Sequence, residues 1–111
     1  MDKKDFYRLH ADFCKSISNP KRQEILEALR EKEKTVNELI EETKISQSNL
    51  SQHLSILRSK GIVRARRDGT NIYYSIANKK ITRAYDLVSQ VLMESLASQN
   101  KAIKDALNHK K

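Results

Sequence analysis

This 111-residue sequence has no tryptophan, one cysteine, one proline and two glycines. A single cysteine excludes a disulfide framework within the chain and a cysteine-rich zinc module. With only Gly61 and Gly69 available, there is no glycine-rich loop to hold a phosphate, and no nucleophile and base stand at a recognisable spacing. We therefore expect a protein that is not an enzyme and uses no cofactor.

Long apolar runs are also missing. No stretch approaches the roughly 20 apolar residues that cross a bilayer as a helix. The first residues, Met-Asp-Lys-Lys-Asp, lack the apolar segment of a secretory signal. The length is that of one domain with a modest core. The sequence therefore predicts a single cytoplasmic domain over residues 1–111, without a membrane partner.

Acidic residues are nearly absent from one part of the chain. Between residues 44 and 85, nine lysines and arginines stand against one acid, Asp68, so this segment holds the entire net charge of +8. Charges kept only for solubility would be scattered over the whole surface. A polyanion such as nucleic acid is therefore the expected partner.

Within this basic segment, residues 45–61 predict a helix with two distinct sides. Ser46 is a good N-cap and Gly61 a good stop. Three leucines at helical spacing mark the inner side: Leu50, Leu54 and Leu57. The other side has polar side chains and no carboxylate: Gln47, Ser48, Ser51, Gln52 and Ser55. Such a side suits the major groove of DNA. An ordinary helix with one side in solvent can have the same pattern of polar residues.

The flanking segments predict further helices and a hairpin. Amphipathic helices are expected over about 5–18 and 20–32, and a capping box from Thr35 to Glu38 opens a short helix that completes a helix-turn-helix over about 35–60. Two alternating runs over about 62–76, joined at Asp68-Gly69, predict a β-hairpin, the wing. A last helix over about 78–108 has more apolar surface than so small a core covers, which implies a partner helix from a second copy.

The motifs in this order resemble the ArsR-type (arsenic-repressor) family of small bacterial and archaeal regulators. The resemblance covers about residues 6–96 and rests on three stretches: Ser-Asn-Pro-Lys-Arg-Gln-Glu-Ile-Leu at 18–26, Ser-Gln-Ser-Asn-Leu-Ser-Gln-His-Leu-Ser-Ile-Leu at 46–57, and the hairpin with its flanks at 60–76. It implies a mainly α winged helix-turn-helix with a small β-hairpin, dimerised through its first and last helices. It also implies a repressor that reads an inverted repeat in double-stranded DNA until an effector binds.

The resemblance assigns roles to individual residues. The polar side chains named above would contact bases, and the expected phosphate contacts are Lys60, Arg64, Arg66 and Arg67. His53, at the histidine of the family's Ser-x-His-Leu pattern, either contacts DNA or packs against the wing. The expected dimer interface comprises Phe6, Leu9, Phe13, Tyr85, Val88, Leu92 and Leu96.

The effector is not specified by these residues. The third helix lacks the paired cysteines of many relatives, and Val88 replaces the histidine that would accompany Asp86 in others, so we predict no metal site. Cys14 shares a helix face with His10. We expect Cys14 to be a small buried residue. The alternative is that Cys14 and His10 form half of a metal or redox site that a partner subunit completes, with thiol oxidation as a signal that weakens DNA binding.

Two other functions compete with a specific repressor. An architectural protein that coats DNA would share the basic segment but would not need the hydrogen-bonding side of the helix at 47–55. A protein-interaction adaptor would use the long last helix and would not bind duplex DNA at about 0.1 M salt.

Overall fold

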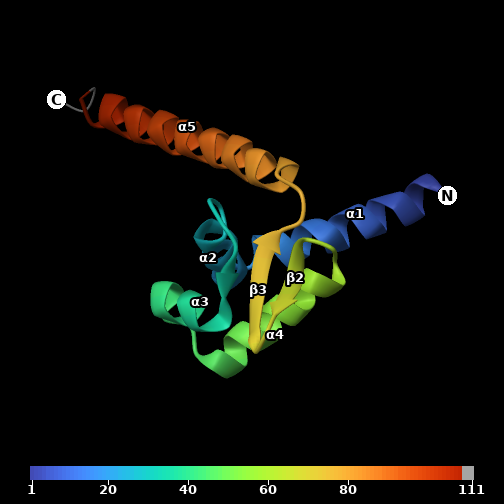
Figure 1. The fold of residues 1–111 in the computed structure, drawn as a ribbon. Helices are drawn as coiled ribbons and strands as arrows, with labels where there is room; N and C mark the ends of the chain where they lie inside the picture. The colour runs from blue at the N-terminus through green and yellow to red at the C-terminus, as the bar shows by residue number, and fades with distance from the viewer. Residues whose placement is uncertain (109–111) are drawn as a thin grey trace. The chain divides into compact units, whose positions relative to one another are not determined.

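The structure is a computed structural model that describes residues 1–108, so residues 109–111 of the predicted domain lie outside the described part (Figure 1). Its elements are α1 (Lys3–Ser18), α2 (Pro20–Ala28), β1 (Lys34–Thr35), α3 (Val36–Thr43), α4 (Gln47–Ser59), β2 (Val63–Asp68), β3 (Asn71–Ile76) and α5 (Lys80–Asn108). They divide into two compact units, one ending at Lys79 and one beginning at Lys80. The prediction of a mainly α fold with a small β-hairpin is confirmed.

The core of the first unit lies where α2, α3, α4 and the start of β2 meet. Each of these helices turns one apolar side inward, as the helical spacing predicted. The six largest fully buried side chains are Ile25, Leu39, Leu50, Leu54, Leu57 and Ile62. This shared core fixes α4 against α2 and α3, and so fixes the direction of its polar side.

Local capping signals set most of the helix starts. The Asn19 side chain accepts hydrogen bonds from the backbone N–H groups of Lys21 and Arg22 at 3.0 and 3.2 Å, ahead of Pro20 at the first helical position. The capping box at the start of α3 is also present as predicted. The predicted end of α2 near residue 32 was wrong, because the helix stops at Ala28 and the chain turns back to place the next residues in the sheet.

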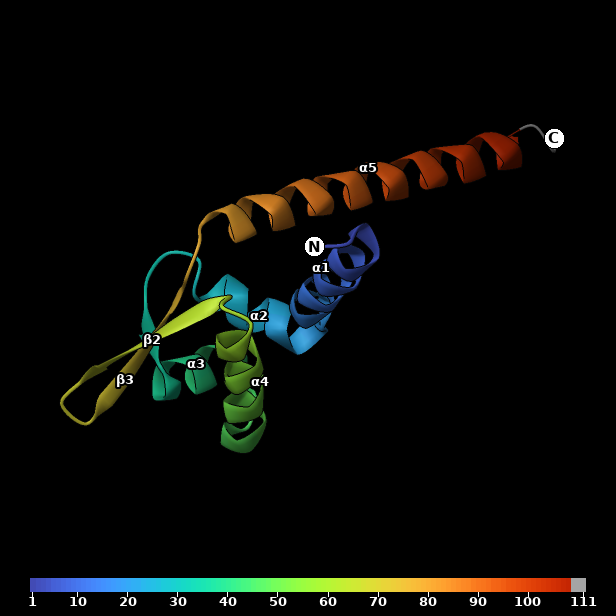
Figure 2. The same ribbon diagram turned by 90° about the vertical axis from the view of Figure 1, so that its right-hand side faces the viewer.

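The sheet has three antiparallel strands in the order β1-β3-β2. The hairpin of β2 and β3 matches the prediction, and its turn contains Gly69 at a φ of +62°, a conformation that suits glycine. Two-residue β1, which was not predicted, pairs Lys34 with Tyr74 and Thr35 with Tyr73. Because β1 immediately precedes α3, the hairpin is hydrogen-bonded to the entry of the helix-turn-helix. Its tip projects beyond the helices of this unit (Figure 2).

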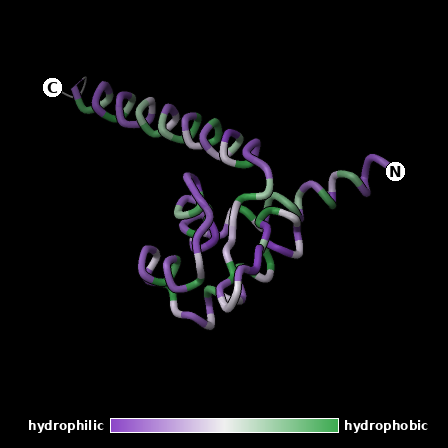
Figure 3. Tube along the Cα trace, viewed as in Figure 1, coloured by the Kyte–Doolittle hydropathy of each residue, from purple (hydrophilic) through white to green (hydrophobic). Residues whose placement is uncertain are grey.

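Helix α5 forms the second unit and is described by itself. It runs for 29 residues, none of which is buried. Apolar and polar residues alternate along it in the hydropathy colouring (Figure 3). Within residues 1–108, no helix is both long and apolar enough to cross a membrane.

Candidate nucleic-acid interface

Helix α4 is positioned by its cap and by its apolar side. The Ser46 hydroxyl accepts a hydrogen bond from the backbone N–H of Asn49 at 3.4 Å, as the sequence predicted. Before it, Lys44 adopts a left-handed φ of 60°, which ends α3, and the buried side chain of Ile45 follows. Three leucines anchor the inner side: Leu50, Leu54 and Leu57. The outer side of α4 therefore has a fixed orientation in this unit.

The outer side of α4 presents the polar residues that we predicted as base contacts. All five are exposed: Gln47, Ser48, Ser51, Gln52 and Ser55. Within residues 1–108, none of these side chains makes a hydrogen bond or ion pair. Helix α4 also contains no carboxylate. This surface can donate and accept hydrogen bonds at base edges without repelling phosphates.

Arg58 extends this surface and was not among the residues predicted to contact DNA. It is exposed in the last turn of α4, three residues after Ser55 and seven after Ser51, which is the spacing of one helix side. The sequence alone could have identified Arg58 from this spacing. A cation here adds a candidate phosphate contact at the end of the polar surface.

His53 lies between α4 and α2, half-buried. Its Nδ1 accepts a hydrogen bond from Nε of Arg22 at 3.3 Å, and Nη1 of Arg22 donates to the carbonyl oxygen of Ser16 at 3.1 Å. Burial lowers the pKa of His53, and the positive charges of Arg22 and Lys21 lower it further. The hydrogen-bond partner of His53 in the described part of the chain is therefore on α2.

The wing arginines have different surroundings. Arg64, Arg66 and Arg67 are all exposed on β2. Within the described part of the chain, Arg64 and Arg67 have no ion pair. Arg66 donates from Nε to Oε2 of Glu33 at 3.2 Å and from Nη2 to Oε1, and its guanidinium carbon lies 4.7 Å from the centre of the Tyr73 ring. Arg64 and Arg67 are therefore free to bind a phosphate, whereas Arg66 already binds a carboxylate.

Lys60, the fourth predicted phosphate contact, also has an acidic partner. Its ammonium group donates to the carboxylate of Asp12 on α1. This pair links the residue that ends α4 to α1. A phosphate contact by Lys60 requires exchange of that carboxylate for the phosphate.

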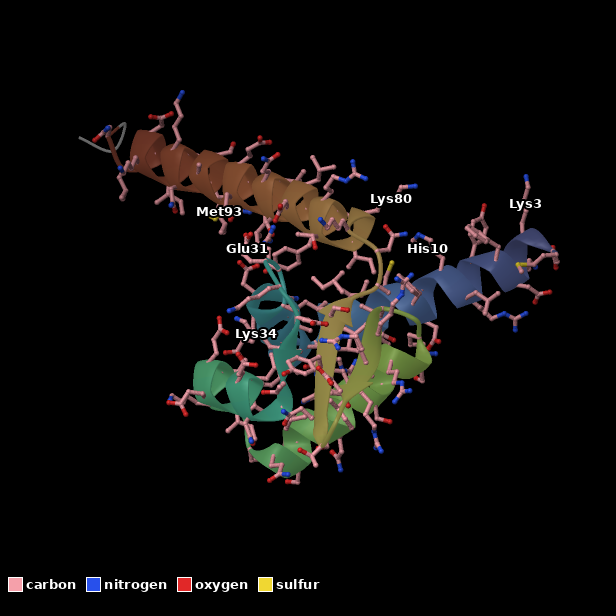
Figure 4. All side chains as sticks on the ribbon, viewed as in Figure 1. Lys3, His10, Glu31, Lys34, Lys80 and Met93 are labelled. Carbon is pink, nitrogen blue, oxygen red and sulfur yellow. The ribbon has the colours of Figure 1, made fainter. Side chains whose placement is uncertain are left out.

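The predicted dimer face on α1 is exposed in the single chain. The exposed fractions of Phe6, Leu9 and Phe13 are 52%, 57% and 37%. Cys14 is also exposed, with its Sγ 3.6 Å from Nδ1 of His10, so the expectation that it is buried was wrong for the single chain. Figure 4 shows His10 on α1. Such an apolar helix side in contact with water is typical of an interaction surface.

Helix α5 has its own apolar side. Val88, Leu92 and Leu96 are exposed by 69%, 56% and 44%, and Tyr85 is half-buried. These four residues recur at intervals of three and four, so they lie on one side of the helix. Within residues 1–108, no three histidine, cysteine or acidic side chains gather in a group that could hold a metal ion.

Comparisons with known sequences support one family. Residues 19–65 match the family described as bacterial regulatory protein, arsR family. The chain is 38% identical to Rv0081 of Mycobacterium tuberculosis, an HTH-type transcriptional regulator, over 95% of this chain and 93% of that protein. It is also 38% identical to a transcriptional repressor SmtB homolog of Synechocystis, over 77% of this chain and 64% of that protein.

Solved structures agree with the sequence comparisons. The crystal structure of Rv0081 matches 85% of this chain and 95% of that one, with a TM-score of 0.79 and 40% identity. The homodimeric winged helix-turn-helix DNA-binding domain Mb0332 of Mycobacterium bovis matches 85% and 87%, with a TM-score of 0.75 and 34% identity. Sequence identity and coverage at this level, together with the polar outer side of α4 and its adjoining wing, show that the chain belongs to the ArsR family of DNA-binding transcriptional regulators with a winged helix-turn-helix fold.

Proposed function

We propose that this protein is a homodimeric repressor that reads an inverted repeat in double-stranded DNA. Helix α4 lies in the major groove, and the wing contacts the adjacent backbone. Gln47, Ser48, Ser51, Gln52 and Ser55 read base edges. Arg64 and Arg67 contact phosphates directly, whereas Lys60 first exchanges its carboxylate partner, Asp12. His53 supports α4 from the α2 side.

The observation that supports this proposal most strongly is the exposed polar side of α4, which forms no hydrogen bond with the rest of the described chain. Five exposed hydrogen-bonding side chains have no partner within residues 1–108, on a helix whose inner side is fully buried. Glutamine can bond adenine through two hydrogen bonds, and serine can bond several bases. A protein that only coats DNA needs cations for phosphates but not this surface.

The apolar sides of α1 and α5 support the homodimer. Each exposes large apolar side chains that a single chain leaves in water. A second copy offers the same two surfaces, and a twofold dimer buries them together. The solved relative Mb0332 is described as homodimeric. A dimer would place two copies of α4 about 34 Å apart, one turn of DNA, and so would read an inverted repeat.

Selection of bound fragments from the source genome tests the proposal. It should be done at about 0.2 M salt, where phosphate contacts alone are weakened. A few promoter fragments sharing an inverted repeat are expected. A broad set of fragments without a shared repeat would favour an architectural protein, and no bound duplex would favour a protein-interaction adaptor. Light scattering on the purified protein should give twice the chain mass.

A repressor acts at the chromosome, so we propose a cytoplasmic location, and the effector that releases DNA is unidentified. Oxidation of Cys14 is one hypothesis for it, since the thiol is exposed in the single chain. Under this hypothesis peroxide weakens DNA binding of the wild-type protein, and Cys14→Ser abolishes that response. A full response in the variant would eliminate the hypothesis.

A further inference from the structure

The Arg66 side chain crosses the whole sheet. Arg66 on β2 is directly opposite Tyr73 on β3, and Tyr73 is directly opposite Thr35 on β1. Glu33 lies two residues before Thr35, on the connection that leads from α2 into β1. The guanidinium passes over the Tyr73 ring and meets the Glu33 carboxylate with two nitrogens. One side chain therefore joins the outer strand of the wing to the start of the helix-turn-helix.

We propose that Arg66 is a positioning residue for DNA binding, which holds the wing at a fixed angle to the helix-turn-helix through Glu33. This inference rests on the proposed function. It assigns the direct phosphate contacts of the wing to Arg64 and Arg67, and it replaces the sequence-based expectation that all three arginines play the same part.

Glu33 and a DNA phosphate would compete for Arg66, and the contacts of Arg66 favour Glu33. A bidentate pair between arginine and carboxylate is geometrically specific, and the aromatic ring beneath adds a cation–π contact. A second carboxylate is also near, since Oδ2 of Asp68 lies 3.8 Å from Nη1 of Arg66. A phosphate that took Arg66 would displace Glu33 and leave its carboxylate beside the DNA. Arg64 and Arg67 meet neither obstacle, since neither has a carboxylate partner within residues 1–108.

The two possible roles of Arg66 make opposite predictions for Glu33→Gln. If Glu33 merely masks a phosphate contact, the variant frees Arg66 and binds DNA more tightly. If Glu33 and Arg66 position the wing, the variant loosens it and binds DNA more weakly. The substitution also removes a negative charge, which tightens DNA binding by itself, so the comparison needs a control with the same change in charge.

Glu31→Gln provides that control. Glu31 lies on the same connection between α2 and β1 (Figure 4), is exposed, and has no ion pair within residues 1–108. Both variants have the same net charge. They differ in that only Glu33→Gln breaks the ion pair with Arg66.

Affinity for a duplex fragment recovered by the selection above, measured by fluorescence anisotropy, is the test. We expect Glu33→Gln to bind about threefold more weakly than Glu31→Gln, the size expected for an exposed ion pair. Exchanging the charges, with Glu33→Arg and Arg66→Glu in one chain, should restore the affinity and the salt dependence to near wild type. Arg67→Ala should instead make the plot of log affinity against log salt less steep. The negative slope should shrink by about 0.9 for each phosphate that the protein no longer neutralises.

Three outcomes would contradict the inference. Equal or tighter binding by Glu33→Gln relative to Glu31→Gln would overturn it while leaving the proposed function intact. A folded charge-exchanged variant that does not recover affinity would do the same. Failure of the wild-type protein to bind any duplex would overturn the proposed function and this inference together.

Discussion

The two helices of the helix-turn-helix share one construction and differ in their outer surfaces. Both α3 and α4 begin at a hydroxyl cap and bury leucines against the same core. On α3 the outer side chains include three carboxylates: Glu38, Glu41 and Glu42. On α4 there is none. The inner sides thus serve folding in the same way, and the outer sides differ in charge.

The outer residues also differ in what they contact. Glu38 accepts hydrogen bonds from the Thr35 backbone and hydroxyl, which lower its pKa, and Glu42 pairs with Lys34. The five polar side chains that we predicted as base contacts on α4 have no such partners within residues 1–108. The carboxylates of α3 therefore have partners within the chain itself. The polar side of α4 is left for another molecule.

The largest expected effect tests whether the inner sides are equivalent. Leu39→Ala and Leu54→Ala each remove a side chain that is at most 1% exposed. Each should lower the free energy of unfolding by about 2–5 kcal/mol, through reduced burial and the cavity left behind. Urea denaturation measures both, with Ser55→Ala as the surface control within about 0.5 kcal/mol of wild type. If only one of the two variants lost this much unfolding free energy, the buried sides of α3 and α4 would not contribute equally to stability.

The next effect tests the opposite charge of the outer sides. Ser51→Glu places a carboxylate on α4, where it would face phosphates, and should weaken DNA binding by about 3 kcal/mol, or roughly 100-fold. Glu41→Gln on α3 should change affinity by less than about twofold, since we place α3 away from the phosphates. Comparable effects of the two substitutions on binding to the same duplex would show that α4 does not face DNA.

A smaller effect distinguishes reading of bases from attraction to phosphates. Gln47→Ala should reduce discrimination between the operator and a scrambled duplex by about 1–3 kcal/mol, because alanine cannot make the bidentate hydrogen bonds to a base. Affinity for the scrambled duplex should stay near wild type. Competition binding with the two duplexes measures the difference. Unchanged discrimination would mean that Gln47 reads no base.

The smallest effect concerns His53, which belongs to neither side of α4. Because its pKa in the folded protein lies below 6.5, the unfolded chain takes up the proton first as the pH falls. The contribution of His53 to stability is therefore complete above about pH 6.5 and declines as the pH falls toward its folded pKa. Urea denaturation from about pH 8 to about pH 5 should show less of this decline in His53→Gln. An identical pH dependence in both proteins would contradict the assignment.

The sequence predicted the features that depend on neighbouring residues. The Asn19-Pro20 start of α2, the capping box at Thr35 and the turn at Gly69 each act within four residues, so their patterns are visible without the fold. The exposed polar side of α4 follows from helical spacing for the same reason. Its contact with DNA bases is still a prediction.

The features that the sequence did not predict join residues far apart. Arg66 meets Glu33 across 33 positions, His53 meets Arg22 across 31, and Lys60 meets Asp12 across 48. No local pattern marks such pairs, because any exposed arginine or lysine could take any carboxylate. Strand β1 was missed because two residues show no alternation, and the early end of α2 follows from the position of that strand.

Thr35 belongs to two elements at once, and this limits how the length of the chain can vary. It pairs with Tyr73 in the sheet, and its side chain accepts the hydrogen bond that begins α3. An insertion on either side of Thr35 would shift α3 relative to the sheet, or would disrupt either the strand pairing or the helix cap. The turn around Gly69 belongs to the hairpin tip alone. We therefore expect related sequences to differ in length at the wing tip, and to keep the spacing between Lys34 and Glu38 constant.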